Sequence, residues 1–324
     1  MMKNNRFLYV CMFLLTGMLL LNSCSEGSEE KNNDCLKRSE GPNVVGGTME
    51  FAYAMALPKT EGHWIEATVV ATFPGAAGTT LENMSYHTDG SGFDQGIVIG
   101  NPCENIENRT KVTFARDTCA ATLRYHYVVP EEARGKQVSF MFTATSSTGK
   151  VVSRGMGPYQ VSNMDMALDI VLKNRDCFSL TDMRVLTAAE ATANPEKVDF
   201  VYSYQALRGV IFRHALVSPT AANLGEYLKS VSLPAGLSNS TRMVRTYGSC
   251  DQQLARDEYG VFVDDIDFQT KSFDKAPDYI INLPVKGGAW METSDGRYRA
   301  YLYVNSATET RAGMTISMKR MKMW

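Results

Sequence analysis

The sequence predicts an all-β protein of two consecutive domains: an immunoglobulin-like β-sandwich, then a second β-rich domain with short helices. Two observations predict this fold class. Apolar residues recur at alternate positions in many short segments, which is the pattern of a strand buried on one face. Turn residues such as Thr148-Gly149 separate these segments, as in antiparallel sandwiches. The 324 residues are also enough for two cores.

Residues 1–23 have the parts of an export signal. Lys3 and Arg6 are basic, and Phe7–Leu21 is almost wholly apolar. This run of fifteen residues is shorter than the roughly 20 that span a bilayer, so a signal peptide is favoured over a membrane helix. Leu21-Asn22-Ser23-Cys24 resembles the bacterial lipobox. The resemblance implies that Cys24 is the lipidated first residue of the exported protein.

Residues 24–43 are rich in Glu, Asn, Lys and Ser, and we expect them to form a flexible tether. Their acidic start, residues 25–30, resembles the surface-export signal of Bacteroidetes lipoproteins. A solvated spacer without an address is the alternative. The resemblance implies a protein that is lipid-anchored in the outer membrane and exposed on the cell surface.

Residues 44–175 are predicted to form the sandwich. Alternating patterns predict its strands, with Gln137–Val161 holding two of them around a turn: Thr48–Leu57, Trp64–Phe73, Leu123–Val129, Gln137–Val161 and, closing the domain, Met166–Leu172.

Residues 176–324 are predicted to form the second domain. Short helices are expected over Thr187–Ala193 and Ser218–Lys229, where Ser218 is a suitable N-cap, with a helical turn over Cys250–Glu258. Strands are expected over Val198–Gln205, Val210–Val217, Tyr259–Phe268, Tyr279–Val285, Arg297–Val304 and Met314–Lys322.

The charge of the chain argues against a nucleic-acid partner. Without Lys3 and Arg6, 31 of the 33 basic residues remain against 35 acidic ones, a net charge near −4. A nucleic-acid surface would need a basic stripe instead. The only basic cluster, residues 319–322, is expected on the exposed face of the last strand.

The cysteines predict at most one disulfide. Cys103 and Cys119 flank a predicted hairpin and are the only pair that we expect to be bridged; burial as small apolar residues is the alternative. No Cys/His spacing typical of zinc sites occurs.

No catalytic residue or cofactor is predicted, because nucleotide, nucleophile-elbow and metalloprotease motifs do not occur. Two acidic segments are candidate cation sites. Asp264, Asp265 and Asp267 fit an acidic strand edge or a cation site. His87–Asp94 has alternating oxygen ligands and glycines, which fit a plain loop or a metal loop.

Aromatic residues give the one predicted ligand site. Trp290 lies in a turn-rich stretch close in sequence to Tyr298 and Tyr301. Flat rings stack on sugars, so these three residues are the expected glycan-binding platform. The alternative is that the rings fill the core.

Three segments carry a wider resemblance: GGTMEFAYAMALP at 46–58, GAAGTTLENMSYHTDGSG at 75–92 and INLPVKGGAWMETSDGRYRAYLYVNS at 281–306. With the lipobox, they resemble a Bacteroidetes family of two-domain surface lipoproteins of unknown function. The resemblance covers nearly the whole exported chain. It implies a two-part, β-rich extracellular protein with a role near glycan-utilisation systems or the cell envelope. Because the sequence contains no catalytic motif, we expect a non-catalytic protein that binds a glycan or another surface protein, or is an accessory part of a surface complex. The alternatives are a structural or adhesive subunit of fimbrillin type and, third, a glycan hydrolase.

Overall fold

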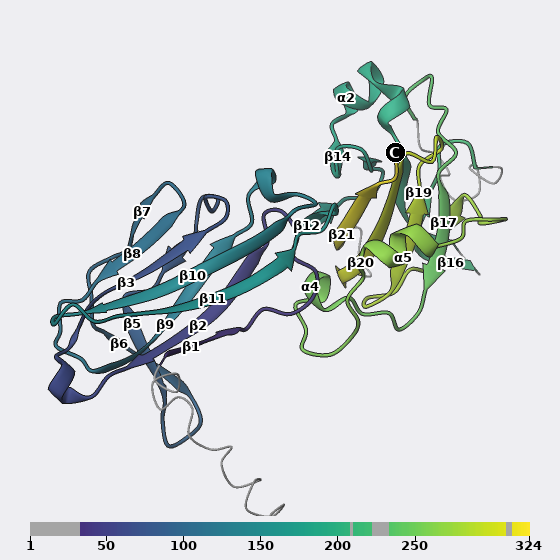
Figure 1. Ribbon diagram of the computed structural model, residues 1–324. Coiled ribbons are helices and arrows are strands. Elements are labelled where there is room, and N and C mark those ends of the chain that lie inside the picture. The colour runs from purple at the N-terminus through teal and green to yellow at the C-terminus, as the bar shows by residue number, and fades with distance from the viewer. Residues whose placement is uncertain (1–32, 208–209, 222–232, 309–312) are drawn as a thin grey trace, which may run out of the picture.

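The computed structural model describes residues 33–207, 210–221, 233–308 and 313–324. It has two β-rich halves joined end to end (Figure 1), which confirms the all-β, two-domain prediction. Cys24 and most of the helix predicted over Ser218–Lys229 lie outside the described residues. In the described ranges, no helix has the length and apolarity needed to cross a membrane.

The first half is the expected sandwich of two antiparallel sheets. Their strand orders are those of an immunoglobulin-like domain with one difference. The short edge strand Thr80–Leu81 precedes, rather than follows, the strands at residues 104–113 of the other sheet. One sheet is β1 (Asn33–Lys37), β2 (Thr48–Ala56), β9 (Ala120–Val128) and β4 (Thr80–Leu81). The other is β11 (Val151–Gln160), β10 (Gln137–Ser146), β3 (Trp64–Ala71), β8 (Arg109–Thr113) and β7 (Glu104–Ile106).

An aromatic core joins these two sheets. Alternation along β2 and β9 turns Phe51, Tyr53 and Tyr125 inward, where all three are buried. The ring of Phe51 lies 4.8 Å from that of Phe140 on the facing sheet. Such tilted ring pairs bury large apolar areas and add stability beyond burial itself. A separate hairpin, β5 (Met84–Thr88) and β6 (Asp94–Val98), projects from this half.

The second half contains two antiparallel sheets of five strands each. The C-terminal sheet is β12 (Asp165–Leu172), β21 (Met314–Lys322), β20 (Tyr298–Ala307), β19 (Gly288–Glu292) and β17 (Arg242–Thr246). The other sheet is β14 (Arg184–Leu186), β13 (Cys177–Ser179), β15 (Phe200–Leu207), β16 (Val210–Val217) and β18 (Tyr279–Ile280). The described helices of this half are α2 (Ala188–Ala193), α4 (Gln252–Ala255) and α5 (Asp265–Thr270), with a 3-10 turn at Pro195–Lys197. The first half has 3-10 turns at Lys59–Glu61 and Glu131–Ala133.

Both faces of the C-terminal sheet are buried. Leu302 of β20 faces the other sheet, in a core with Phe178 and Phe200. The neighbouring residue Tyr301 faces the opposite way, into a core with Leu254 of α4 and Phe268 of α5. These two short helices therefore cover a face that would otherwise meet water.

Three predicted segments are corrected by the structure. Met166–Leu172 does not close the first half, because β12 pairs with β21 of the second half. The expected tether is wrong for Asn33–Lys37: these residues pair with β2, and Cys35 is buried in the core. Tyr259–Phe268 is not a strand. Asp264 caps α5, and its side chain accepts hydrogen bonds from the backbone N–H of Ile266 and Asp267.

The halves meet through packed and polar contacts. Val44 and Met164 are buried in the core that contains α4 and α5. The hydroxyl of Ser162 donates to the carboxylate of Asp265. The guanidinium of Arg134 pairs with Asp165 at 2.8 Å, and the Gln253 amide donates to the carbonyl of Pro42 at 3.0 Å. These contacts place α4 and the loop after it against the first half (Figure 1).

Candidate functional site

The predicted aromatic platform is wrong, because its rings are inside the protein. Trp290 is 7% exposed and Tyr301 is fully buried. The Trp290 ring lies 5.1 Å from Phe268 and 4.9 Å from Tyr301. Tyr298 is half-buried, with the guanidinium of Arg320 4.7 Å from its ring. The alternative, that these rings fill the core, is the one that the structure supports.

The acidic segments are used for local structure. Asp264 and Asp267 form the capping box of α5, and Asp265 contacts Ser162. In the His87–Asp94 loop, Asp89 accepts backbone hydrogen bonds from Ser91 at 2.8 Å and Phe93 at 3.0 Å, so this carboxylate holds its own turn. Within the described residues, no group of three or more His, Cys, Asp or Glu is arranged to hold a metal ion.

The predicted Cys103–Cys119 disulfide is not formed. Both are free, partly buried thiols. Cys103 lies 3.2 Å from the hydroxyl of Thr80, and Cys119 donates to the carbonyl of Gly62 at 3.3 Å.

The prediction that residues 319–322 lie on an exposed face is wrong for Lys319, because its side chain is fully buried. Its ammonium donates to Asp251 at 2.7 Å and to the carbonyl of Val263 at 2.9 Å. Burial lowers the pKa of Lys319, and the charge of Asp251 opposes this shift. Asp251 also caps α4 by accepting from the N–H of Leu254 at 2.9 Å. The pair therefore fixes both ends of the segment that runs from α4 to Val263.

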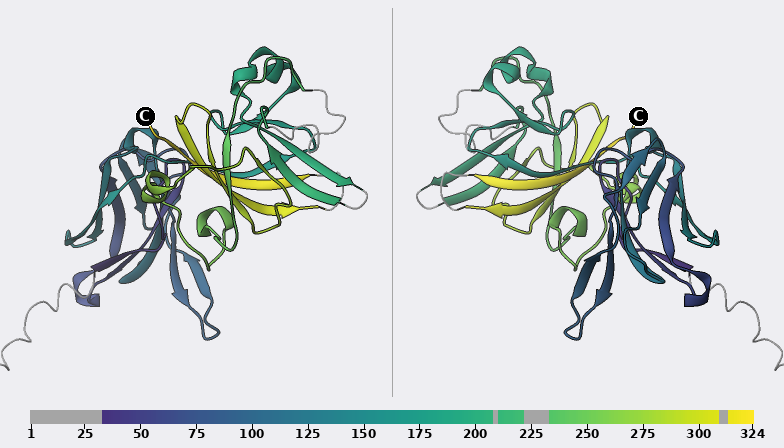
Figure 2. Two further views of the ribbon diagram at one scale, coloured as in Figure 1. Left: turned by 90° about the vertical axis from the view of Figure 1, so that its right-hand side faces the viewer. Right: turned by 90° about the vertical axis from the view of Figure 1, so that its left-hand side faces the viewer.

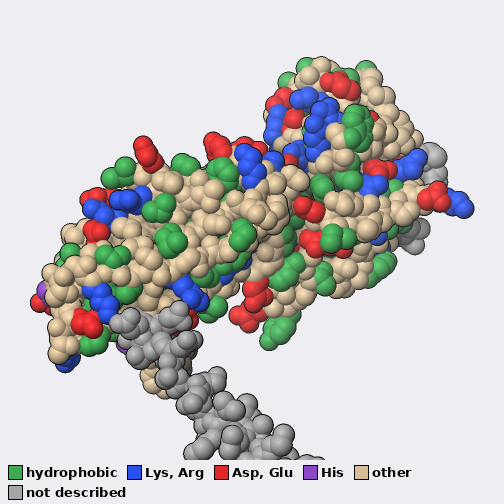
Figure 3. Space-filling view, viewed as in Figure 1, with side chains coloured by type: hydrophobic (Ala, Val, Ile, Leu, Met, Phe, Trp, Pro, Cys, Tyr) green, Lys and Arg blue, Asp and Glu red, His purple; other side chains and the backbone are tan. Residues whose placement is uncertain are grey.

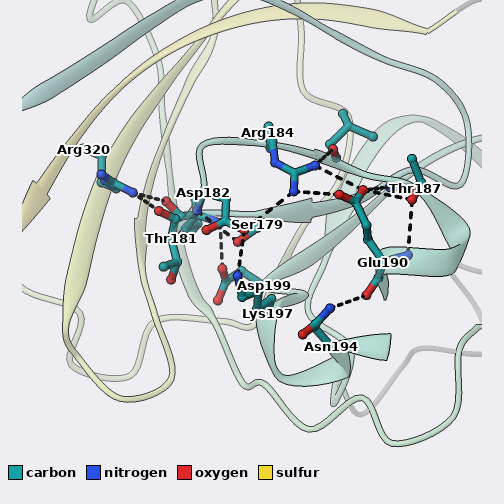
Figure 4. Close-up of polar contacts among 12 residues, drawn as sticks. Ser179, Thr181, Asp182, Arg184, Thr187, Glu190, Asn194, Lys197, Asp199 and Arg320 are labelled. Atoms are coloured by element: carbon teal, nitrogen blue, oxygen red, sulfur yellow. Dashed lines mark hydrogen bonds and ion pairs between the residues drawn. The ribbon is translucent and has the colours of Figure 1, made fainter. Parts of the chain in front are cut away.

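A second polar network surrounds Asp199, before β15 (Figure 4). Asp199 is 3% exposed and accepts from the N–H of Leu180 at 2.7 Å. Burial raises its pKa to about 7, although that hydrogen bond opposes the shift. Asp182 nearby pairs with Lys197 at 3.2 Å. The carboxylates of this network brace the chain between β13 and α2, so we assign it a structural role.

The junction between the halves contains a cleft that is rich in hydrogen-bonding side chains. We call it the junction cleft. It has a volume of about 770 Å³, within the range of small-molecule sites, and such sites occur preferentially at domain interfaces. On the face shown in Figure 3, acidic side chains gather below this junction. The lining residues are Arg38, Glu40 and Glu50 from the first half and Gln252, Gln253, Arg256, Asp257, Glu258 and Phe262 from the second.

The wall from the second half is built by α4 and its following loop. Arg256 takes a left-handed backbone conformation that ends the helix. The amide of Gln252 donates to the carbonyl of Gly260 at 3.3 Å, and the N–H of Val261 donates to Cys250 at 2.8 Å. Gly260 is needed here, because a Cβ atom would lie 2.1 Å from the Cys250 carbonyl. The Lys319–Asp251 pair anchors this closed loop from within the core.

The wall from the first half follows β1. The N–H of Arg38 donates to the carbonyl of Glu50 at 2.7 Å, and the N–H of Glu50 donates to the Ser39 hydroxyl at 3.0 Å. Gly41 has a φ of +76°, and a Cβ atom added there would lie 2.3 Å from the ring of Phe262 in the other half. These contacts hold Arg38, Glu40 and Glu50 beside the loop after α4.

The lining is suited to a polar ligand without a strong negative charge. Four carboxylates face two guanidinium groups and two amides. Carboxylates accept hydrogen bonds and guanidiniums donate them, so together they match hydroxyl groups, which do both. Phe262 adds an apolar ring to the lining, and Tyr259, in the same loop, is 80% exposed.

The junction cleft is absent from the sequence predictions for a physical reason. Its two walls are about 200 residues apart in the chain, and neither contains a local motif. The sequence predicts a tether over residues 38–43 and a helical turn over residues 250–258. The dense polar run Gln252–Glu258 was the only available signal.

Two family models match consecutive parts of the chain. Residues 28–161 match a domain of unknown function, DUF4466, and residues 162–323 match another, DUF8576. The border between the matches lies just before β12, where the sheets of the second half begin. No functionally curated protein matches the chain.

The comparison with solved structures shows an extensive similarity. The chain is similar to a DUF4466 family protein from Parabacteroides merdae, with 40% identity and a TM-score of 0.83 over 90% of this chain and 98% of that one. The major pilin subunit BcpA of Bacillus cereus, in its D312A form, aligns with 9% identity and a TM-score of 0.30 over 59% of this chain and 58% of that one, a likeness that carries no argument. By the first match and the two family models, the chain belongs to the DUF4466 family and carries a DUF8576 domain in its second half.

Proposed function

We propose that this protein is a non-catalytic, lipid-anchored protein of the outer cell surface that binds a glycan in the junction cleft. The observation that carries the proposal is the lining of the cleft: carboxylates, guanidiniums and amides from both halves converge on one open space beside an aromatic ring. Sugar hydroxyls need such paired donors and acceptors. The lipobox-like Leu21–Cys24 segment supports the address.

The excess of carboxylates narrows the ligand class. The cation of Arg256 is already paired with Asp169 outside the cleft, at 2.7 Å. Of the four carboxylates in the lining, Asp257 lies 4.0 Å from Lys286 and Glu50 lies 3.7 Å from the ring of His126. A polyanionic glycan would meet Glu40, Glu50 and Glu258 at short range, where like charges repel. A neutral oligosaccharide is therefore the proposed ligand.

Retention on an array of neutral polysaccharides tests the binding site. The probe is the soluble chain from Ser25, compared with its Arg38→Ala/Glu258→Ala variant. Both side chains are exposed, so the variant should keep its melting temperature. It should bind about tenfold or more weakly, because hydrogen bonds to charged groups are each worth about 1.5–3 kcal/mol.

The matched control is Arg116→Ala/Glu196→Ala, which removes the same two residue types from exposed sites outside the cleft. It should bind like the parent chain. Equal binding by both double variants would reject the junction cleft as the site. Release of reducing sugar would instead favour the hydrolase alternative.

The address is tested separately by labelling cells with a fatty-acid analogue. The parent chain should take up label and the Cys24→Ala variant should not, because only a thiol at that position can accept the lipid. Equal label in both chains would reject the lipobox.

A further inference from the structure

The β5–β6 hairpin projects from the first half (Figures 1 and 2). It is attached through β5: the Ser85 hydroxyl accepts from the N–H of Thr122 in β9 at 3.1 Å. The guanidinium of Arg124 lies 3.8 Å from the Tyr86 ring. All five residues of β6, in contrast, are exposed. β5, together with Asp94 at the start of β6, thus holds the hairpin in place, while the side chains of β6 are exposed.

The outward part of the hairpin is unusually apolar. Phe93 at the tip is 69% exposed, and Ile97 and Val98 on β6 are 47% and 52% exposed. Single exposed apolar residues need no explanation, but a group of them on one projecting element marks a contact surface.

The two carboxylates of the hairpin both have partners within the protein. Asp89 accepts from Ser91, Phe93 and the Gln95 side chain, and Asp94 pairs with Arg124. The Asp89 carboxylate is therefore turned into its own loop, and Phe93 is the exposed apolar side chain of the tip.

The described chain begins at the base of this hairpin. Asn33 and Asp34 line the same cavity as Ser85, Tyr86 and His87, with a volume of about 380 Å³. Eight residues lie between Cys24 and Asn33, so nine Cα–Cα steps join these two positions. Even fully extended, they reach only about 30 Å. A lipid on Cys24 would hold the base of the hairpin within that distance of the bilayer.

We propose that Phe93 and the exposed face of β6 rest on the membrane surface in which Cys24 is anchored. The inference rests on the lipid anchor of the proposed function. Apolar and aromatic side chains gain free energy at the boundary of headgroups and acyl chains, and this contact adds to that of the lipid. The hairpin would then fix the orientation of the protein, with the second half directed away from the hairpin.

Bromine-quenched tryptophan fluorescence tests this contact on the acylated full chain. Phe93→Trp and, as a control on the second half, Ile266→Trp are placed in phosphatidylcholine vesicles with or without brominated acyl chains. Phe93 and Ile266 are similarly exposed, at 69% and 64%. The emission added by Phe93→Trp should fall about twofold in brominated vesicles, because its ring lies at the acyl boundary. The Ile266→Trp emission should not change.

Flotation of the same vesicles separates the two claims. Chains that float without quenching at position 93 would overturn the hairpin contact and leave the anchor intact. Chains that do not float would overturn the anchor and the contact together. A blue shift at position 93 without bromine quenching would indicate burial against protein, such as a second copy, and would also overturn the membrane contact.

Discussion

Trp290 lies between Phe268 and Tyr301 with little exposed surface, so it contributes to stability rather than to a surface platform. We expect Trp290→Ala to lower the free energy of unfolding by about 3–5 kcal/mol, because it leaves a cavity in a packed core. Chemical denaturation of the soluble chain measures this loss.

Trp324 offers a matched control because its side chain is 70% exposed. Trp324→Ala should change stability by no more than about 0.5 kcal/mol. Similar stabilities for the two variants would contradict the burial of Trp290.

Asp199 makes stability depend on pH. Its pKa in the folded chain is about 7, against an ordinary value of 3.8. Between these values the folded chain holds a proton that the unfolded chain releases. The bound proton therefore adds to the free energy of unfolding. This added stability is fully present below the ordinary pKa and is lost as the pH rises through about 7. Between about pH 5 and pH 8, the loss should be about 2–3 kcal/mol.

The Asp199→Asn variant isolates this contribution. Asparagine stays neutral and keeps an acceptor for the N–H of Leu180. The free energy of unfolding of Asp199→Asn, measured by denaturation across the same pH range, should fall by about 2–3 kcal/mol less than that of the parent chain. Parallel pH profiles would show that Asp199 does not hold the proton.

For single residues, the sequence predicts which side chains of the first half point into the core, but not which side chains of the C-terminal sheet are buried. Alternation correctly paired Tyr125 with Tyr127 and Phe140 with Phe142 as core residues. It could not show that the opposite face of the C-terminal sheet is covered too. Trp290, Tyr301 and Lys319 all lie on that face, so all three were misplaced for the same reason.

The elements that cover this face are the short helices α4 and α5. Helices of four and six residues give weak periodic signals. Their caps were nevertheless visible in the sequence: Asp251 and Asp264 each precede an apolar residue three or four positions later. The alternating pattern around Asp264 and Asp267 predicts a strand edge, whereas in the structure their side chains form the capping box of α5.

Gly41 links the segment after β1 to the loop after α4. We expect Gly41→Ala to destabilise the junction of the halves, because a Cβ atom would lie 2.3 Å from the Phe262 ring and the φ of +76° is strained for alanine. Gly46→Ala is the matched control, since its φ is +78° but no atom lies within 4 Å of the added carbon.

The control variant should lose about 1–2 kcal/mol from backbone strain alone. Gly41→Ala should lose more and should also bind the array glycan more weakly, because Phe262 must move. Equal losses, with unchanged binding, would show that the Gly41–Phe262 contact does not shape the cleft.

At the scale of the whole molecule, the sequence predicted two β-rich halves but not how they meet. Local patterns encode strands, whereas the junction depends on contacts such as Gln253 with Pro42, which are 211 residues apart. A cleft formed by such distant segments has no motif. Its residues became candidates only once the halves were placed together.

The central claim is that one ligand binds both walls of the junction cleft, and hydrogen–deuterium exchange tests it most directly. The soluble chain is compared with and without a neutral oligosaccharide that it retains on the array. We predict slower exchange in peptides covering residues 38–50 and 252–262 at the same time, because a ligand in the cleft contacts both. Slower exchange in only one of these segments, or in neither, would contradict the claim.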